Sequence, residues 1–181
     1  MKRIFLALLV TVSATIFFAQ TALSQPHPRK GSSPQDLMIK YEVETAISML
    51  QTIFVKHQKG EWTLDQAKQL GADLLRGLQY GKDGYFWADT TEGVNVVLYG
   101  QTDVEGKSRL EFKDAKGKFI VKDFIAKGKA GGGYEDYWFP KEHETTPARK
   151  RSYVQAFEPF GWVIGTGYYL PTEKASGEKA K

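Results

Sequence analysis

The chain has no cysteine among its 181 residues. This absence excludes cysteine nucleophiles, disulfide bonds, iron–sulfur clusters and thiolate zinc sites. Charge of one sign is not in excess either, because 25 Lys and Arg residues are set against 21 Asp and Glu residues, for a net charge of +4. Proteins that track nucleic acid gather their basic residues on one face, whereas here both signs are interspersed along the chain. We therefore expect no nucleic-acid partner.

The motifs that mark common catalytic and nucleotide sites are missing as well. No G-x-S-x-G, H-E-x-x-H or G-x-x-x-x-G-K-[ST] pattern occurs in the chain. The glycines at 131–133 lack the Lys-Ser/Thr of a phosphate loop and indicate a bend before a strand instead. The neighbours Glu142, His143 and Glu144 do not point at one metal ion in regular structure. We predict no catalytic residue, no metal and no cofactor.

One long apolar run is present, at the start of the chain. Lys2 and Arg3 precede apolar residues 4–19, and the letters ALS at 22–24 fit the small-x-small pattern of signal peptidase sites. This pattern favours a signal peptide over 1–24 and a mature protein that is periplasmic or secreted. The alternative is an uncleaved membrane anchor, although the run is shorter than the ~20 apolar residues of a spanning helix. No comparable run follows, so we expect that the mature form does not span a membrane.

The remaining sequence divides into a linker, one domain and a tail. Residues 25–34 (QPHPRKGSSP) are rich in proline and serine, which indicates a linker. Residues 171–181 lack large apolar side chains, which indicates a disordered tail. One domain over 35–170 lies between them.

Two helices are predicted at the start of this domain. Apolar residues recur at helical spacing over 39–54, which predicts one long amphipathic helix. Gly60 suits the end of that helix. Thr63 and Gln66 form a capping-box pattern that begins a second helix, with buried positions up to Leu78.

Aromatic residues become frequent after the helices, since 18 of the 24 lie between 80 and 169. Short runs separated by glycine and Lys/Asp turns predict five strands, at 85–89, 95–99, 134–139, 149–157 and 162–169. A stretch compatible with a helix, 119–127, lies between the second and third strands. Two helices followed by a mainly antiparallel sheet predict an α+β domain in which the long helix covers one face of the sheet.

Six segments, in order and at matching spacing, resemble the single-Cache type 2 family. They are YGKDGYFWADT (80–90), GVNVVLYG (93–100), EGKSR (105–109), KDAKGKF (113–119), GGGYEDYWFPK (131–141) and KRSYVQAFEPFGWVIGTGYYL (150–170). Domains of this family form the extracytoplasmic sensing part of many bacterial chemoreceptors and sensor kinases. The resemblance implies a PAS-like Cache fold, in which the helices pack on a five-stranded antiparallel sheet with a small ligand pocket on the other face. It also implies a small organic acid or related metabolite as ligand, and a membrane receptor or kinase as the candidate partner.

Two features depart from the family pattern. The second strand of the family usually ends in His-Pro, whereas Tyr99-Gly100 stands there in this chain. Tyr99 is therefore a candidate pocket hydroxyl, and the ligand preference is expected to differ. In receptors a transmembrane helix follows the last strand, whereas a charged tail follows it here, so the resemblance supports only the binding step.

The candidate cationic contacts are Lys150 and Arg109. Lys150 matches the lysine of the family's K-x-S-Y strand, and we predict that it pairs with a ligand carboxylate. The alternative is a solubilising surface lysine beside Arg149 and Arg151. Arg109 has a planar guanidinium that can hold a carboxylate through two hydrogen bonds; its alternative is a structural ion pair that holds the loop.

Trp87, Tyr137 and Phe139 are the candidate aromatic walls, at positions that the family keeps aromatic. For each of them the alternative is ordinary core packing. Asp89 and Asn95 can hold a ligand amine or tie a turn. If the pocket were filled by the protein's own side chains, the domain would be a protein-interaction module instead.

Overall fold

The computed structural model describes residues 32–142 and 144–171. Its elements, in chain order, are α1 (Pro34–Gln58), α2 (Leu64–Gly77), β1 (Gln79–Tyr80), β2 (Gly84–Thr90), β3 (Asn95–Leu98), the 3-10 turn η1 (Thr102–Val104), α3 (Ile120–Lys129), β4 (Gly133–Pro140), β5 (Pro147–Phe157), the 3-10 turn η2 (Glu158–Phe160) and β6 (Trp162–Tyr169). The expected signal peptide, the linker up to residue 31 and the tail from residue 172 lie outside the described residues.

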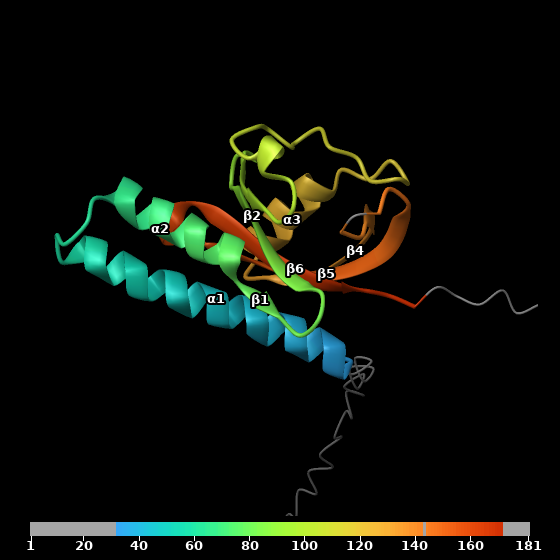
Figure 1. Ribbon diagram of the computed structural model, residues 1–181, viewed down its shortest axis with the longest axis horizontal. Helices are drawn as coiled ribbons and strands as arrows, with labels where there is room; N and C mark the ends of the chain where they lie inside the picture. Colours follow the sequence, from blue (N-terminus) through green and yellow to red (C-terminus); the bar gives the residue numbers. More distant parts are fainter. Residues whose placement is uncertain (1–31, 143, 172–181) are drawn as a thin grey trace, which may run out of the picture. The chain divides into compact units, whose positions relative to one another are not determined.

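The strands form one antiparallel sheet in the order β1-β2-β6-β5-β4, and β3 pairs with β2 beside this path. The α+β class and the five predicted strands are confirmed. The two-residue strand β1 was not predicted, because so short a segment carries no alternation of apolar and polar residues. Helices lie on both faces of the sheet, with α1 and α2 on one side and α3 on the other (Figure 1).

The long helix α1 begins with a capping box. The Ser33 side chain accepts a hydrogen bond from the Asp36 N–H, and the Asp36 carboxylate accepts one from the Ser33 N–H. Pro34 is the first helical residue, a position at which its missing N–H is not needed. The helix therefore begins within the last residues that the sequence analysis assigned to the linker.

One apolar stripe of α1 packs on the sheet and on α2. Its buried hydrophobic members are Ile39, Val43, Ala46, Leu50 and Ile53. Gly71 lets α2 approach closely, because a Cβ at that position would lie 2.9 Å from the Leu50 Cδ2 atom. This side of the domain is thus an ordinary helix-on-sheet core.

The opposite face of the sheet holds a more aromatic cluster. It contains Tyr85, Trp87, Leu98, Ile120, Val121, Phe124, Tyr137, Phe139, Val154 and Val163. The helix α3 covers it close to the sheet, since a Cβ at Gly128 would lie 2.9 Å from the Val163 side chain. The long irregular segment between β3 and α3 belongs to this side of the domain as well (Figure 1).

Candidate ligand-binding site

The strand β5 carries three successive cationic side chains, which alternate between the two faces of the sheet. Arg149 and Arg151 pair with Asp136 on the α1 side. Lys150 points to the α3 side and is only 1% exposed. The interpretation of Lys150 as a solubilising surface residue is therefore wrong.

The Lys150 ammonium has aromatic neighbours and one hydroxyl partner. Its Nζ donates a hydrogen bond to the Tyr85 hydroxyl at 2.6 Å. The same atom lies 4.1 Å from the ring centroid of Tyr85, 5.1 Å from that of Tyr169 and 5.8 Å from that of Phe139. Within residues 32–142 and 144–171, no carboxylate forms an ion pair with it. A buried cation is thus held by one hydroxyl oxygen and three aromatic rings.

A small cavity lies beside this ammonium. It is lined by Tyr85, Trp87, Leu98, Arg109, Ile120, Phe124, Tyr137, Phe139 and Lys150. Its volume of about 10 Å³ is close to the ~10–15 Å³ that one water molecule needs. Five of the six residues predicted as ligand contacts line it, namely Trp87, Arg109, Tyr137, Phe139 and Lys150. The structure therefore brings together residues that are up to 63 positions apart in the sequence.

The sixth predicted residue, Tyr99, does not line the cavity. It lies just after the end of β3, and its ring stacks on Tyr85 with centroids 5.3 Å apart and an interplanar angle of 22°. Tyr99 thus packs against Tyr85, which lines the cavity, without lining the cavity itself.

Arg109 reaches the cavity from the segment between β3 and α3, and it is tied to a buried carboxylate. Its Nη1 lies 3.1 and 3.2 Å from the two carboxylate oxygens of Asp89, which is 1% exposed. Burial raises the pKa of Asp89 above its usual value, although Arg109 and Asn95 oppose the shift. The structural ion pair that the sequence analysis weighed for Arg109 is therefore present. Its contact with a ligand remains a prediction.

Asn95 completes this polar corner. Its Nδ2 donates to the Asp89 carboxylate at 2.9 Å and to the carbonyl oxygens of Ala88 and Val97. These bonds tie β3 to the bulge in β2 between Ala88 and Asp89. Asp89 and Asn95 are thus bound to each other and to the sheet.

Trp87 and Tyr137 supply buried polar atoms to the aromatic wall. The Trp87 ring packs against Gly165, where a Cβ would lie 2.3 Å from its Cζ2 atom. Its buried Nε1–H has no acceptor among the described residues. The Tyr137 hydroxyl shares a hydrogen bond of 2.9 Å with Ser152, and burial raises the pKa of Tyr137, so this hydroxyl is neutral.

Tyr85 and Tyr169 are contacts of Lys150 that the sequence analysis did not select. Alternation along β2 places Tyr85 on the same face as Trp87, and this signal was available in the sequence. Tyr169 lies beside Lys150 because the two residues are register partners across β6 and β5. No local pattern of residues specifies that register.

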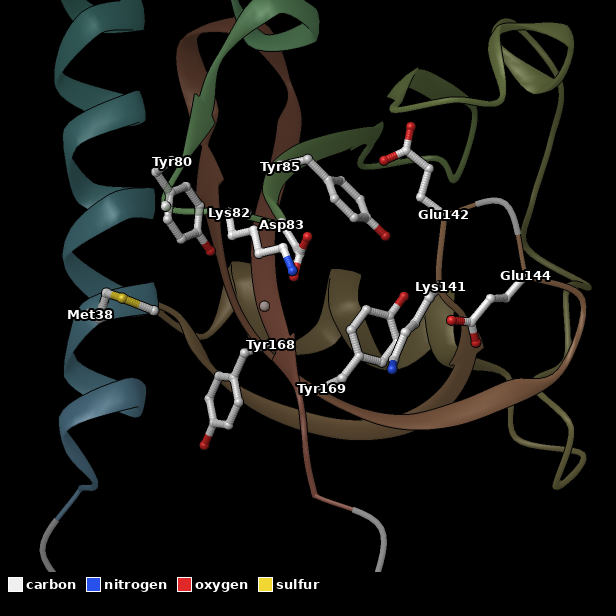
Figure 2. Close-up of a pocket in the computed structure, with 13 residues that line it drawn as sticks. Met38, Tyr80, Lys82, Asp83, Tyr85, Lys141, Glu142, Glu144, Tyr168 and Tyr169 are labelled. Carbon is white, nitrogen blue, oxygen red and sulfur yellow. The ribbon is translucent and has the colours of Figure 1, made fainter.

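A larger concavity adjoins the cavity and shares Tyr85 with it (Figure 2). This outer basin has a volume of about 700 Å³. Its described lining includes Met38 of α1, Tyr80 to Tyr85 of the β1–β2 hairpin, and Gly167, Tyr168 and Tyr169 of β6. The basin is thus lined by residues from the N-terminal part of a helix, a hairpin turn and the end of a central strand.

Neither a metal cluster nor a spanning helix was found in the part of the chain that the structure describes. Within that part, no three His, Asp or Glu side chains are grouped to hold a metal ion. No helix in residues 32–142 and 144–171 is both long enough and apolar enough to cross a membrane.

The comparison with known families agrees with the fold. A family profile described as Single Cache domain 2 matches residues 33–178. The chain belongs to the single Cache type 2 family. Sensor domains of this family are ligand-binding modules of chemoreceptors and sensor kinases.

Three relatives show where such Cache domains occur. The sensor histidine kinase MctS of Rhizobium johnstonii is 38% identical over 125 residues, which cover 69% of this chain and 26% of that protein. This chain thus spans about a quarter of the length of that relative. A solved periplasmic sensor domain of a chemotaxis protein has a TM-score of 0.72 and 29% identity, and the match covers 75% of this chain and 94% of that one. A Cache chemosensory domain solved for its carboxylic acid recognition also has a TM-score of 0.72 and 29% identity, with 75% and 92% covered.

Proposed function

We propose that this Cache domain binds a small monocarboxylic acid beside Lys150, in the cavity enlarged by movement of its lining side chains, without catalysis, as an extracytoplasmic sensor. The observation that carries the proposal is the buried ammonium of Lys150, which is 1% exposed and has no carboxylate partner among the described residues. A buried charge is costly unless an opposite charge pairs with it. A ligand carboxylate supplies that charge.

The charges around the cavity favour a single negative charge on the ligand. Lys150 and Arg109 bring one positive charge each, and Asp89 neutralises one through its ion pair with Arg109. One positive charge is left, which a monoanion balances. A dicarboxylate would place a second charge among aromatic and aliphatic side chains.

The remaining lining favours a short apolar group on the acid. Trp87, Ile120 and Phe124 provide apolar surface, and the Trp87 Nε1–H offers a free donor. The solved Cache domain that recognises carboxylic acids supports this ligand class. The proposed location outside the cytoplasm is supported by the similar periplasmic sensor domain and by the signal-peptide pattern.

A thermal-shift screen of acetate, propionate and pyruvate against malate and glycine tests the proposal. A ligand at about a hundred times its Kd adds ~2.7 kcal/mol of stability, and each kcal/mol raises the Tm of a domain of this size by ~2–4 °C. We expect a rise of several degrees with at least one monocarboxylate, and an NMR spectrum in which the acid is recovered unchanged.

A matched pair of variants assigns the binding to Lys150. Lys150→Met is expected to abolish the shift, whereas Lys129→Met, at an exposed lysine near the end of α3, is expected to keep it. Equal binding by the Lys150→Met variant would remove Lys150 from the site. The absence of any shift at millimolar acid would overturn the ligand class.

The small size of the cavity, about 10 Å³, favours a second candidate function. If the aromatic side chains fill the site permanently, the domain is a protein-interaction module. Ligand density in a crystal soaked with the acids distinguishes the two functions, because a permanently filled cavity has no room for density.

Export can be tested independently of binding. We expect N-terminal sequencing of the exported protein to return Gln25 or a residue within a few positions of it, since ALS at 22–24 precedes it. A sequence that starts at Met1 would indicate a membrane anchor.

A further inference from the structure

The central sheet splits beside the outer basin. The pairing of β2 with β6 runs from Thr90 and Trp162 to Phe86 and Thr166. Beyond that point, Gly84 and Tyr85 pair with β1, while residues 167–169 pair with β5. The two strands thus part, and the basin of about 700 Å³ is lined by residues on both sides of the split.

Two tyrosines stand between this basin and the Lys150 ammonium. Tyr85 lines both the basin and the cavity, and Tyr169 lines the basin while its ring centroid lies 5.1 Å from the Lys150 Nζ. Figure 2 shows their hydroxyl groups directed toward one another at one side of the basin. Tyr169 is also anchored, because its hydroxyl donates a hydrogen bond of 2.7 Å to the Pro140 carbonyl. The Tyr85 hydroxyl, in contrast, bonds to the side chain of Lys150 rather than to the backbone.

The cavity is covered on another side by the segment that carries Arg109, and this segment is fastened at several points. Arg109 forms the buried ion pair with Asp89. The Arg76 guanidinium of α2 holds the Glu105 carboxylate through two hydrogen bonds, of 3.1 and 2.8 Å. Moving the segment would break both contacts and leave a buried charge unpaired.

A third contact fastens the same segment to the edge of the sheet. The Asp114 carboxylate accepts a hydrogen bond of 3.0 Å from the Trp138 N–H of β4. It also accepts from the Lys116 and Lys118 N–H groups, which close its own turn. Moving Tyr85, in contrast, breaks its hydrogen bond with Lys150, the contact of its ring with the same ammonium and its stacking on Tyr99. The path through the split thus requires one side chain to turn, whereas the other path requires a whole segment to leave Asp89, Arg76 and Trp138.

We propose that the ligand reaches Lys150 through the outer basin, between β2 and β6, and that the Tyr85 side chain is the gate. The proposal rests on the proposed function, since it concerns access to the same site. In the closed arrangement the Tyr85 hydroxyl holds the Lys150 ammonium. The gate opens when the Tyr85 ring turns toward the basin, and the arriving carboxylate then replaces the hydroxyl on Lys150.

The absence of cysteine from the chain makes a clean test possible, because a single introduced cysteine is the only thiol that can be labelled. Lys82→Cys places a label on the hairpin turn that lines the basin, and Lys107→Cys places the same label on the segment next to Arg109. Both native lysines are exposed. Each variant is modified with a bulky maleimide, and the kinetics of acetate binding are followed by NMR line shape.

The labelled Lys82→Cys variant is expected to bind and release acetate about tenfold more slowly, with the Kd within about twofold of the unlabelled value. The labelled Lys107→Cys variant is expected to keep both rates. The opposite pattern places the access route under the Arg109 segment. Unchanged rates in both variants also overturn the proposal.

Two further variants test the gate itself. Tyr85→Phe keeps the ring but loses the hydroxyl that holds Lys150, and it is expected to raise both rate constants by about threefold or more. Tyr134→Phe is the matched control, because the Tyr134 hydroxyl bonds to the Asp36 carbonyl of α1 and its side chain lines neither the basin nor the cavity. Equal rates in the Tyr85→Phe variant and the native protein would remove this role from Tyr85.

A readout without acid separates this proposal from the proposed function. Acrylamide, a small neutral quencher, reaches Trp87 only through the route that opens. The quenching of Trp87 fluorescence is obtained by subtracting the quenching measured in the same protein carrying Trp87→Phe. We expect the label at position 82 to reduce this quenching and the label at position 107 to leave it unchanged. If none of the acids binds, the proposed function fails, while the quenching pattern still supports or overturns the route.

Discussion

Two neighbouring residues of β5 show that the two faces of the sheet give a positive charge different partners. On the α1 side, the Arg151 guanidinium lies 2.7 Å from the Asp36 carboxylate and 2.7 Å from the Asp136 carboxylate. On the α3 side, the Lys150 ammonium lies against a tyrosine hydroxyl and aromatic rings. The first face pairs its charges internally and gains stability from them. The second holds a cation that has no carboxylate partner among the described residues.

The carboxylates of the two faces differ in the same way. Burial raises the pKa of Asp36, but hydrogen bonds from Arg151, Ser33 and Tyr168 outweigh it, so that the pKa is lower than usual. For Asp89, burial outweighs Arg109 and Asn95, and the pKa is raised. The α1 face thus favours its ionised carboxylate, whereas the cavity face bears an ionised carboxylate at a cost.

The largest expected effect comes from breaking the ion pair on the cavity face. Asp89→Ala leaves the Arg109 guanidinium buried without a partner, and we expect a loss of about 3–5 kcal/mol in the free energy of unfolding. Urea denaturation measures it. A loss below ~1 kcal/mol would show that Arg109 swings out to solvent, and the cavity face would then be less closed than its burial indicates.

The apolar part of the α1 face gives the next effect. Leu50 is fully buried between α1, α2 and the sheet, and Leu50→Ala is expected to cost about 2–5 kcal/mol. Acid affinity, measured by calorimetry at a temperature where the variant is folded, is expected to stay unchanged. A change in affinity would mean that the two faces are not independent.

A pair of substitutions on β5 tests the comparison, because their effects on stability are expected to have opposite signs. Arg151→Met deprives Asp36 and Asp136 of a shared partner and is expected to lower stability by about 1–3 kcal/mol. Lys150→Met removes a buried charge at similar volume and is expected to raise the stability of the protein without added acid by about 1–2 kcal/mol. Thermal melts without acid measure both. Losses of equal size would show that Lys150 is structural.

The smallest effects concern pH. Because the folded pKa of Asp36 is lowered, its share of the stability is present above the unfolded value of about 3.9 and is lost as the pH falls through the folded pKa. Asp36→Asn is expected to flatten the acid limb of the stability curve. Asp89 acts with the opposite sign, since its raised folded pKa means that protonation relieves a cost as the pH falls. If Asp89→Asn instead flattened the acid limb of the stability curve, the opposite signs assigned to Asp36 and Asp89 would be wrong.

Local patterns were sufficient for most of the fold. Helical spacing in α1, the capping box at Thr63 and the short runs between turn residues at β2 and β4 follow from interactions within a few residues, and all are confirmed. The start of α1 at Pro34 was missed because a Ser-Pro pair suits a linker as well as a helix cap.

The candidate site was predictable only as a set of residues. The family resemblance selected Lys150, Arg109 and the aromatic walls, and the structure places them around one cavity apart from Tyr99. The place of Tyr169 depends on the register of β6 against β5. The pairing of Arg109 with Asp89, and hence the charge that is left for a ligand, depends on a long loop whose path no local pattern specifies.

The Asp114 turn has a consequence for the solubility of the protein. β4 is the last strand of the sheet, and the outer edge of such a strand is a template on which another chain can add a strand. Asp114 occupies the Trp138 N–H on that edge, and the Lys118 ammonium occupies the Asp136 carbonyl at 3.1 Å. The loop that brings Arg109 to the cavity thereby also blocks the edge of the sheet against aggregation.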